Sequence, residues 1–296
     1  MSIIEVSRLT KDYGGGKGIF DVDLHVEEGE IFGFLGPNGA GKTTTIRNLL
    51  GFIRPDSGQA RIKGRDCFHQ AAEVHRQLGY LAGELAFFDD LSGRQMIQLV
   101  AELKGACGQN RIGELMERFD LNPQGKIKKM SKGMKQKIGI VCAFMNDPAI
   151  IILDEPTSGL DPLMQNEFVE LLLEEKKKGK TIFMSSHIFE EVERTCDRTA
   201  IIKDGKIVTI EDMASLRAKK QKSFVITFDC EEELRRFLKE PFDVASTQGN
   251  TATVLLSGGV DGLVKTAAGY NVQDLDVKSS SLEEIFLRYY GEGAAK

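Results

Sequence analysis

The sequence lacks any run of about 18 to 20 consecutive apolar residues, the length that a membrane-spanning helix needs. Its first stretch, Met1 to Asp12, has no apolar core of the kind that secretory signal peptides carry. The five cysteines are scattered and include no C-x-x-C pair, which argues against a disulfide framework or a thiolate metal site. We therefore expect a cytoplasmic chain with reduced thiols and no membrane segment of its own.

An excess of positive charge is also missing. The formal net charge of −5 argues against attraction of the whole surface to nucleic acid or anionic lipid, so no nucleic-acid partner is expected. The 296 residues, 41% hydrophobic and 28% charged, are typical of a globular protein with one large domain or a large and a small one.

The sequence does contain a glycine-rich stretch of the form G-x-x-x-x-G-K-[ST], followed by a further threonine. Its residues are Gly36, Pro37, Asn38, Gly39, Ala40, Gly41, Lys42, Thr43 and Thr44. In such a loop, glycines let successive backbone N–H groups converge on one phosphate. Lys42 can reach the outer phosphates and the Thr43 hydroxyl can ligate Mg²⁺. The stretch therefore predicts a site for a nucleotide triphosphate and Mg²⁺.

The neighbours of this loop support the prediction. Ile31 to Leu35 is an apolar run of strand length, and Thr45 to Leu50 has the pattern of a helix. The positive end of that helix would face the same anion. A glycine-rich turn formed by chance is the alternative, and the order of strand, loop and helix argues against it.

Other segments indicate an α/β fold. Phe20 to Val26 alternate between apolar and polar residues, as in a half-buried strand, whereas Ala149 to Leu153 are continuously apolar, as in a parallel strand covered on both faces. A predicted helix over 162–178 leads into a strand at Thr181 to Ser185. This alternation predicts a mainly parallel sheet with ligands at the carboxyl ends of its strands.

Between about residues 84 and 148 the pattern is helical. Two apolar stripes have helical spacing; they consist of Met96, Leu99, Val100 and Leu103, then Ile112, Leu115, Met116 and Phe119. A third helix is predicted to open at 130–134. We interpret the stripes as the core of a helical subdomain rather than as part of a site.

A polar, charged stretch at 217–222 predicts a boundary between a nucleotide-binding domain, 1–216, and a small α+β domain, 217–296. The predicted elements of the tail are strand 223–229, helix 231–239, strands 242–247 and 251–256, helix 260–268, strand 271–277 and helix 281–290. The first six follow the β-α-β-β-α-β order of a split βαβ sandwich. The last helix has a capping box, Ser281 with Glu284. This tail contains no catalytic constellation.

Four later motifs follow the phosphate loop in order: Ser131-Lys132-Gly133-Met134, Asp154-Glu155, Ser158-Gly159-Leu160-Asp161, and His187. With them, residues 1–215 resemble the ATP-binding subunit of a bacterial ABC transporter, and the tail resembles the accessory extension of exporter-type subunits. The resemblance implies a P-loop NTPase core with a mainly parallel sheet, antiparallel N-terminal strands and a helical subdomain, followed by the small α+β domain.

The resemblance also implies roles for single residues, with ATP and Mg²⁺ as the bound groups. Asp154 ends an apolar strand and would hold Mg²⁺ together with Thr43. Glu155 would polarise the attacking water, and His187, at another strand end, would lie near the γ-phosphate. Tyr13 would stack on adenine. The alternative for Asp154 and Glu155 is a solvated acidic turn. For His187 it is a structural role, and for Tyr13 it is packing on the core.

Ser131 and Gly133 match two positions of the family signature Leu-Ser-Gly-Gly-Gln, whereas Lys132 and Met134 depart from it. In the family this segment contacts the γ-phosphate of ATP held by the other subunit, and Asp161 is expected at the same nucleotide site. Six lysines make the region basic: Lys126, Lys128, Lys129, Lys132, Lys135 and Lys137. These lysines could form a solvated face, or they could attract the triphosphate bound by the other subunit. The sequence favours neither interpretation.

A second departure concerns a glutamine that the family uses to contact Mg²⁺ and to sense the membrane subunit. Gly83 takes that position, and Glu84 could replace the glutamine through a water. The segment Ala86-Phe87-Phe88 is a candidate docking surface, with ordinary core packing as the alternative.

The resemblance implies an ATPase that powers a separate transmembrane permease, with export as the expected direction. Two copies would close head to tail over two ATP molecules on the inner face of the membrane. A soluble ATPase of the same superfamily, acting on DNA or ribosomes, is the second hypothesis, and a nucleotide-binding module without turnover is the third. The sequence does not identify the cargo.

Overall fold

The computed structural model describes residues 2–105, 109–218, 222–256 and 259–279. The chain divides into two compact units, Met1–Met213 and Ala214–Lys296, which we describe separately. The prediction that residues 1–216 and 217–296 fold as independent domains stays a prediction.

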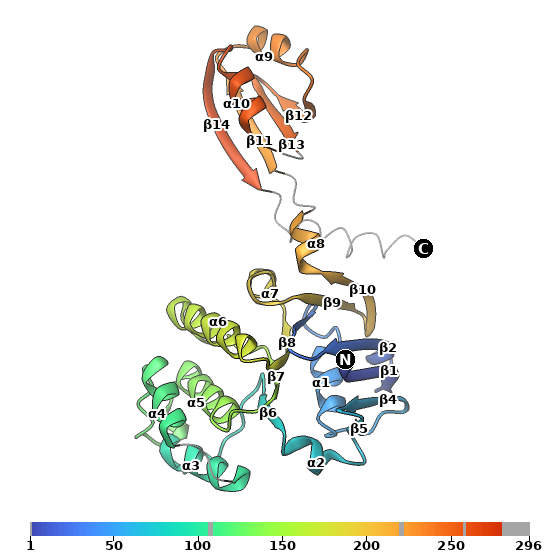
Figure 1. Ribbon diagram of the computed structural model, residues 1–296, viewed down its shortest axis with the longest axis vertical. Helices are drawn as coiled ribbons and strands as arrows, with labels where there is room; N and C mark the ends of the chain where they lie inside the picture. The colour runs from blue at the N-terminus through green and yellow to red at the C-terminus, as the bar shows by residue number, and fades with distance from the viewer. Residues whose placement is uncertain (1, 106–108, 219–221, 257–258, 280–296) are drawn as a thin grey trace. The chain divides into compact units, whose positions relative to one another are not determined.

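The first unit is built on a six-stranded sheet in the order β10-β9-β3-β8-β7-β6 (Figure 1). Its strands are β3 (Ile31–Leu35), β6 (Leu78–Leu81), β7 (Ile150–Asp154), β8 (Thr181–Ser186), β9 (Arg198–Lys203) and β10 (Lys206–Asp212). All pairs are parallel except β9 with β10. Every residue of β3, β7 and β8 is buried, which explains their apolar runs. The predicted mainly parallel α/β fold is confirmed.

A second, antiparallel sheet has the order β2-β1-β4-β5. Its strands are β1 (Ser2–Asp12), β2 (Gly18–Glu27), β4 (Ser57–Ile62) and β5 (Arg65–Asp66). The buried residues of β2 alternate as predicted. Strand β4 ends at Ile62, because Lys63 and Gly64 both have positive φ and form a turn.

The helices of this unit are α1 (Lys42–Leu49), α2 (Ala71–His75), α3 (Gly93–Lys104), α4 (Gln109–Arg118), the 3₁₀ turn η1 (Ile127–Lys129), α5 (Lys132–Phe144), α6 (Pro162–Lys177) and α7 (Phe189–Thr195). In Figure 1, α3, α4 and α5 gather at one end of the unit, away from the antiparallel sheet. Helix α8 (Met213–Ala218) begins where the first unit ends. No helix within the described ranges is long and apolar enough to cross a membrane.

The second unit contains β11 (Lys222–Phe228), α9 (Glu231–Phe237), β12 (Asp243–Gln248), β13 (Thr251–Leu256), α10 (Asp261–Ala267) and β14 (Val272–Ser279). Its sheet order is β12-β13-β11-β14 with every neighbour antiparallel, the arrangement of a split βαβ sandwich. Its core includes Phe224, Ile226, Phe228 and Phe237. The helix predicted over 281–290, with its capping box, lies outside the described residues.

Candidate active site

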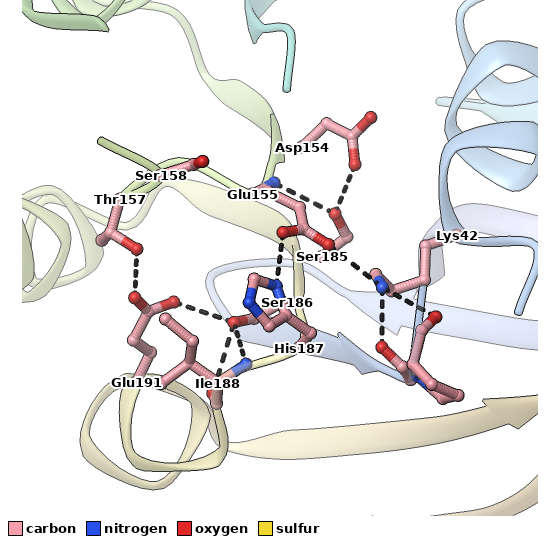
Figure 2. A network of polar contacts seen from close by, with 12 residues as sticks. Lys42, Asp154, Glu155, Thr157, Ser158, Ser185, Ser186, His187, Ile188 and Glu191 are labelled. Atoms are coloured by element: carbon pink, nitrogen blue, oxygen red, sulfur yellow. Dashed lines mark hydrogen bonds and ion pairs between the residues drawn. The ribbon is translucent and has the colours of Figure 1, made fainter. Parts of the chain in front are cut away.

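Sheet register brings the carboxyl ends of three strands together. Leu35 at the end of β3 pairs with Ser186 of β8, and Asp154 at the end of β7 pairs with Ser185 of β8. The phosphate loop follows β3, Glu155 follows β7 and His187 follows β8. Three segments that are distant in the sequence therefore meet at one edge of the sheet, as Figure 2 shows.

The phosphate loop ends in a backbone conformation that favours glycine. Gly41 is the N-cap of α1 with φ of 110°, and a Cβ atom added there would lie 2.6 Å from the Ile19 side chain. No side chain caps the helix, so the first N–H groups of α1 are available to an anion. This is the geometry that the glycine pattern predicts.

Lys42 lies under this loop and is only 5% exposed. Its ammonium donates to the carbonyl oxygens of Gly36 at 2.6 Å and Pro37 at 3.1 Å. Its third contact is an ion pair with Glu155 Oε1 at 3.0 Å. An ammonium has three protons, so these partners fill its hydrogen-bonding capacity. A phosphate that reaches Lys42 must therefore compete with Glu155.

Glu155 has a φ of 49°, a left-handed conformation that is uncommon for residues other than glycine and often marks functional sites. Its side chain is 20% exposed. While Oε1 contacts Lys42, Oε2 lies 2.5 Å from His187 Nδ1. The His187 side chain is half exposed. The backbone thus directs one carboxylate toward both a lysine of the phosphate loop and a histidine at the next strand end.

Asp154 is buried, and both of its carboxylate oxygens accept hydrogen bonds. Thr43 Oγ1 donates to Oδ2 at 2.9 Å, and Ser185 Oγ donates to Oδ1 at 2.5 Å. Gly83 lies on the remaining side, where an added Cβ atom would stand 3.4 Å from the Asp154 carboxyl carbon. Glycine at 83 thus leaves a space beside the carboxylate that a side chain would fill.

The Asp154 carboxylate and the Thr43 hydroxyl are oxygen ligands of the kind that Mg²⁺ prefers. One carboxylate and one hydroxyl would supply the two protein oxygens, and Mg²⁺ usually keeps waters and substrate phosphates as its other ligands. Within the described ranges there is no cluster of three or more His, Cys, Asp or Glu side chains that could form an all-protein metal cage. The residues present therefore fit a metal ion that arrives with a phosphate.

A cavity of about 330 Å³ opens over the loop. Its lining residues are Tyr13, Lys17, Gly18, Asn38, Gly39, Gly41, Lys42, Thr43, Thr44 and Glu155. Tyr13 is 54% exposed, so it does not pack on the core. A larger cavity of about 860 Å³ has a lining from α3, α4 and the segment that follows α4, and it shares no residue with the loop.

Ser131, Gly133 and Asp161 do not line the cavity over the loop. Ser131 caps α5 by accepting the N–H of Met134 at 3.2 Å, and Asp161 caps α6 by accepting the N–H of Met164 at 3.0 Å. Gly133 lies against the adjacent loop, because an added Cβ atom would stand 2.7 Å from the Gly159 carbonyl oxygen. In one copy of the chain, therefore, none of the three lines the cavity over its own phosphate loop.

Comparisons with known proteins agree with this geometry. A sequence model of the ABC transporter family matches residues 19–158. The bacitracin transport ATP-binding protein BcrA of Bacillus licheniformis is 34% identical over 301 residues, which cover 99% of this chain and 98% of BcrA. The chain belongs to the ATP-binding proteins of ABC transporters.

Solved structures add to this result. A structure of the ATP-binding subunit of an ABC transporter is 32% identical, has a TM-score of 0.66, and matches over 73% of this chain and 92% of its own. A dimeric bacterial ABC transporter cassette, MJ0796, has a TM-score of 0.65 over 71% of this chain and 99% of its own. At 23% identity, that match supports the fold alone. The subunit described here is an ATP-binding and ATP-hydrolysing component of a transporter.

In this ABC subunit the sequence motifs account for most of the site but leave out its supporting hydroxyl and carboxylate groups. Ser185 bonds both the Asp154 carboxylate and the N–H of Glu155. Glu191 on α7 bonds Thr157 and Ser186, and burial raises the pKa of its carboxyl group. Helix α7, which carries Glu191, was not predicted from the sequence.

Proposed function

We propose that this chain powers an exporter by binding Mg-ATP at the phosphate loop, pairing with a second copy and hydrolysing the nucleotide. The observation that carries the proposal is the single carboxylate, Glu155, that contacts both Lys42 and His187 at the edge of the sheet. In the proposed roles, Lys42 binds the outer phosphates and Tyr13 stacks on the base. Thr43 and Asp154 hold Mg²⁺, which when bound offsets the negative charge of the phosphate oxygens.

Glu155 is proposed to act as general base. Once the γ-phosphate takes over the Lys42 ammonium, Oε1 of Glu155 loses its cation and can accept a hydrogen bond from water. Attack of that water on the γ-phosphorus breaks the bond to the bridging oxygen, and the water proton passes to the carboxylate. His187 holds Oε2 through Nδ1 and so limits how far the carboxylate can rotate.

Ser131, Gly133 and Asp161 are proposed to serve the site of a second copy. Ser131 is exposed at the N-terminus of a helix, which suits an anion, and it lies apart from the cavity of its own chain. A head-to-tail dimer would bring this helix end to the triphosphate of the partner. Each site would then need both copies, so ATP binding would favour dimerisation.

A separate transmembrane permease is the proposed partner, with this subunit on the cytoplasmic face of the membrane. In the segment proposed for docking, Ala86 is exposed, Phe87 is half-buried and Phe88 is 64% exposed. Core packing thus leaves most of Phe88 accessible to a partner. Export is the proposed direction, and it is supported by the family resemblance of the tail and by the name of BcrA, which describes transport of bacitracin.

The test is the dependence of ATP hydrolysis on protein concentration. We expect the specific activity of the purified chain to rise with concentration, and light scattering to detect a dimer of Glu155→Gln with Mg-ATP but not with ADP. Full activity in a species that stays monomeric under both conditions would overturn the proposal. Co-purification with ribosomes or nucleic acid instead of a membrane protein would favour the soluble-ATPase alternative.

A further inference from the structure

A buried carboxylate, Glu191, is hydrogen-bonded to the two segments that carry Glu155 and His187. Glu191 belongs to α7, four residues after His187, and is only 9% exposed. Its Oε1 accepts a hydrogen bond from Thr157 Oγ1, and its Oε2 accepts one from Ser186 Oγ at 2.8 Å. Figure 2 shows both bonds converging on this one side chain.

The two hydroxyl groups come from the segments that carry the proposed catalytic pair. Thr157 lies two residues after Glu155, on the loop that follows β7, and Ser186 directly precedes His187 at the end of β8. Ser186 Oγ also accepts a hydrogen bond from the N–H of Ile188 at 2.9 Å. Ser186 and Ile188 are the two neighbours of His187 in the sequence, so this bond links the residues on either side of the histidine. Glu191 therefore connects the Glu155 segment to the His187 segment.

A carboxylate at this position is costly unless its hydrogen bonds compensate for lost hydration. Burial raises the pKa of Glu191, while the Thr157 and Ser186 hydroxyls oppose that rise by donating to it. The Thr157 and Ser186 hydroxyls both donate to this carboxylate, and these two bonds restrain the two side chains. The Ile188 carbonyl oxygen, at 3.2 Å, is a second acceptor for the Ser186 proton, and the bond to Glu191 at 2.8 Å is the shorter one. An apolar residue could fill the same space but could not provide this restraint.

We propose that Glu191 is a positioning residue for ATP hydrolysis, which sets the distance between Glu155 and His187 by binding Thr157 and Ser186 together. It contacts neither phosphate-loop residues nor the loop cavity, so its effect must pass through Glu155 and His187. The inference rests on the proposed role of Glu155. It predicts an effect on turnover rather than on nucleotide affinity, because Lys42 and Thr43 keep their places.

The first experiment compares two variants of Glu191 with a matched control on the same helix. Glu191→Ala removes both acceptors, and we expect kcat to fall by about 10- to 100-fold, the scale of a displacement near 1 Å in a catalytic group. The KM for ATP should change by less than about twofold, because uniform substrate binding is retained. Glu191→Gln keeps the shape and one acceptor, so its kcat should fall less, by about 3- to 10-fold. Glu190→Gln, at an exposed position, should keep the parental rate.

A double-mutant cycle tests the connection itself. If Glu191 acts through Thr157, adding Thr157→Val to Glu191→Ala should lower kcat by less than about twofold, although Thr157→Val alone should lower it several-fold. Thermal unfolding and binding of a fluorescent ATP analogue verify that each variant is folded. If Glu191→Ala does not fold, Glu191→Gln alone decides the question, with an expected fall in kcat of about 3- to 10-fold at unchanged KM.

The proposal would be overturned if the folded variants kept the parental kcat. It would also be overturned if the KM for ATP rose while kcat stayed the same. The parallel variant Glu155→Gln separates this failure from that of the proposed function. If Glu155→Gln is inactive while the Glu191 variants are fully active, only the role of Glu191 is wrong. If Glu155→Gln hydrolyses ATP at the parental rate, the role of Glu155 itself is wrong.

Discussion

Replacing Glu155 by glutamine should strengthen the binding of ATP while stopping its hydrolysis. The Glu155 carboxylate lies 3.0 Å from the Lys42 ammonium, and a phosphate that binds Lys42 must displace it. Glutamine has nearly the same shape but carries no charge. Its amide oxygen can still accept a hydrogen bond from Lys42, so the substitution removes the electrostatic part of the competition and leaves the loop in place.

The magnitude follows from the burial of the pair. A hydrogen bond to a charged group contributes about 1.5–3 kcal/mol net, whereas fully exposed ion pairs contribute about 0–1 kcal/mol. Lys42 is almost fully buried and Glu155 mostly buried, so an intermediate value of about 1–2 kcal/mol is reasonable for the charge removed. At about 1.4 kcal/mol per factor of ten, ATP should bind about 5- to 30-fold more tightly. Loss of a general base should lower kcat by at least about 100-fold.

Isothermal titration of Mg-ATP, repeated at several protein concentrations, separates the intrinsic affinity from the contribution of dimerisation. Glu190→Gln provides a control with the same chemical change at an exposed position of α7. If the affinity of Glu155→Gln at low protein concentration equals that of the parent or is weaker, Glu155 does not compete with phosphate for Lys42. Such a result would refute the reasoning even if hydrolysis stopped.

Three further outcomes are expected. Lys42→Ala should weaken ATP binding by at least about tenfold in the same titration, because a charge-assisted phosphate contact is lost, while the exposed control Lys206→Ala should leave it unchanged. Phe88→Ser should reduce recovery of the permease with the tagged subunit and keep the ATPase rate of the isolated chain; equal recovery would rule out this docking surface. A chain truncated after residue 217 should unfold cooperatively with an intact phosphate loop, whereas failure to fold would argue against the predicted boundary.

The local parts of the site could be predicted because they depend on neighbouring residues. One short motif contains Gly41 with its positive φ, the Thr43 hydroxyl and the start of the following helix. The continuous apolar runs of β3 and β7 predicted that both strands are buried. The order of the later motifs was sufficient to indicate the family. The short helices α2 and α7 were not predicted, and α2, with five residues, is too short to define a helical period.

The sequence by itself determined the phosphate loop, the mainly parallel sheet and the order of the elements from β11 to β14 in the second unit. Only the tertiary structure decided that Glu155 contacts both Lys42 and His187, and that Gly83 leaves a space beside Asp154. It also decided that Ser131 and Asp161 cap helices and do not line the cavity over the loop. The physical reason is that the two kinds of feature depend on residues at different separations along the chain. A motif specifies backbone conformation over a few residues, whereas contacts between strand ends depend on the register of β3, β7 and β8 across the whole sheet.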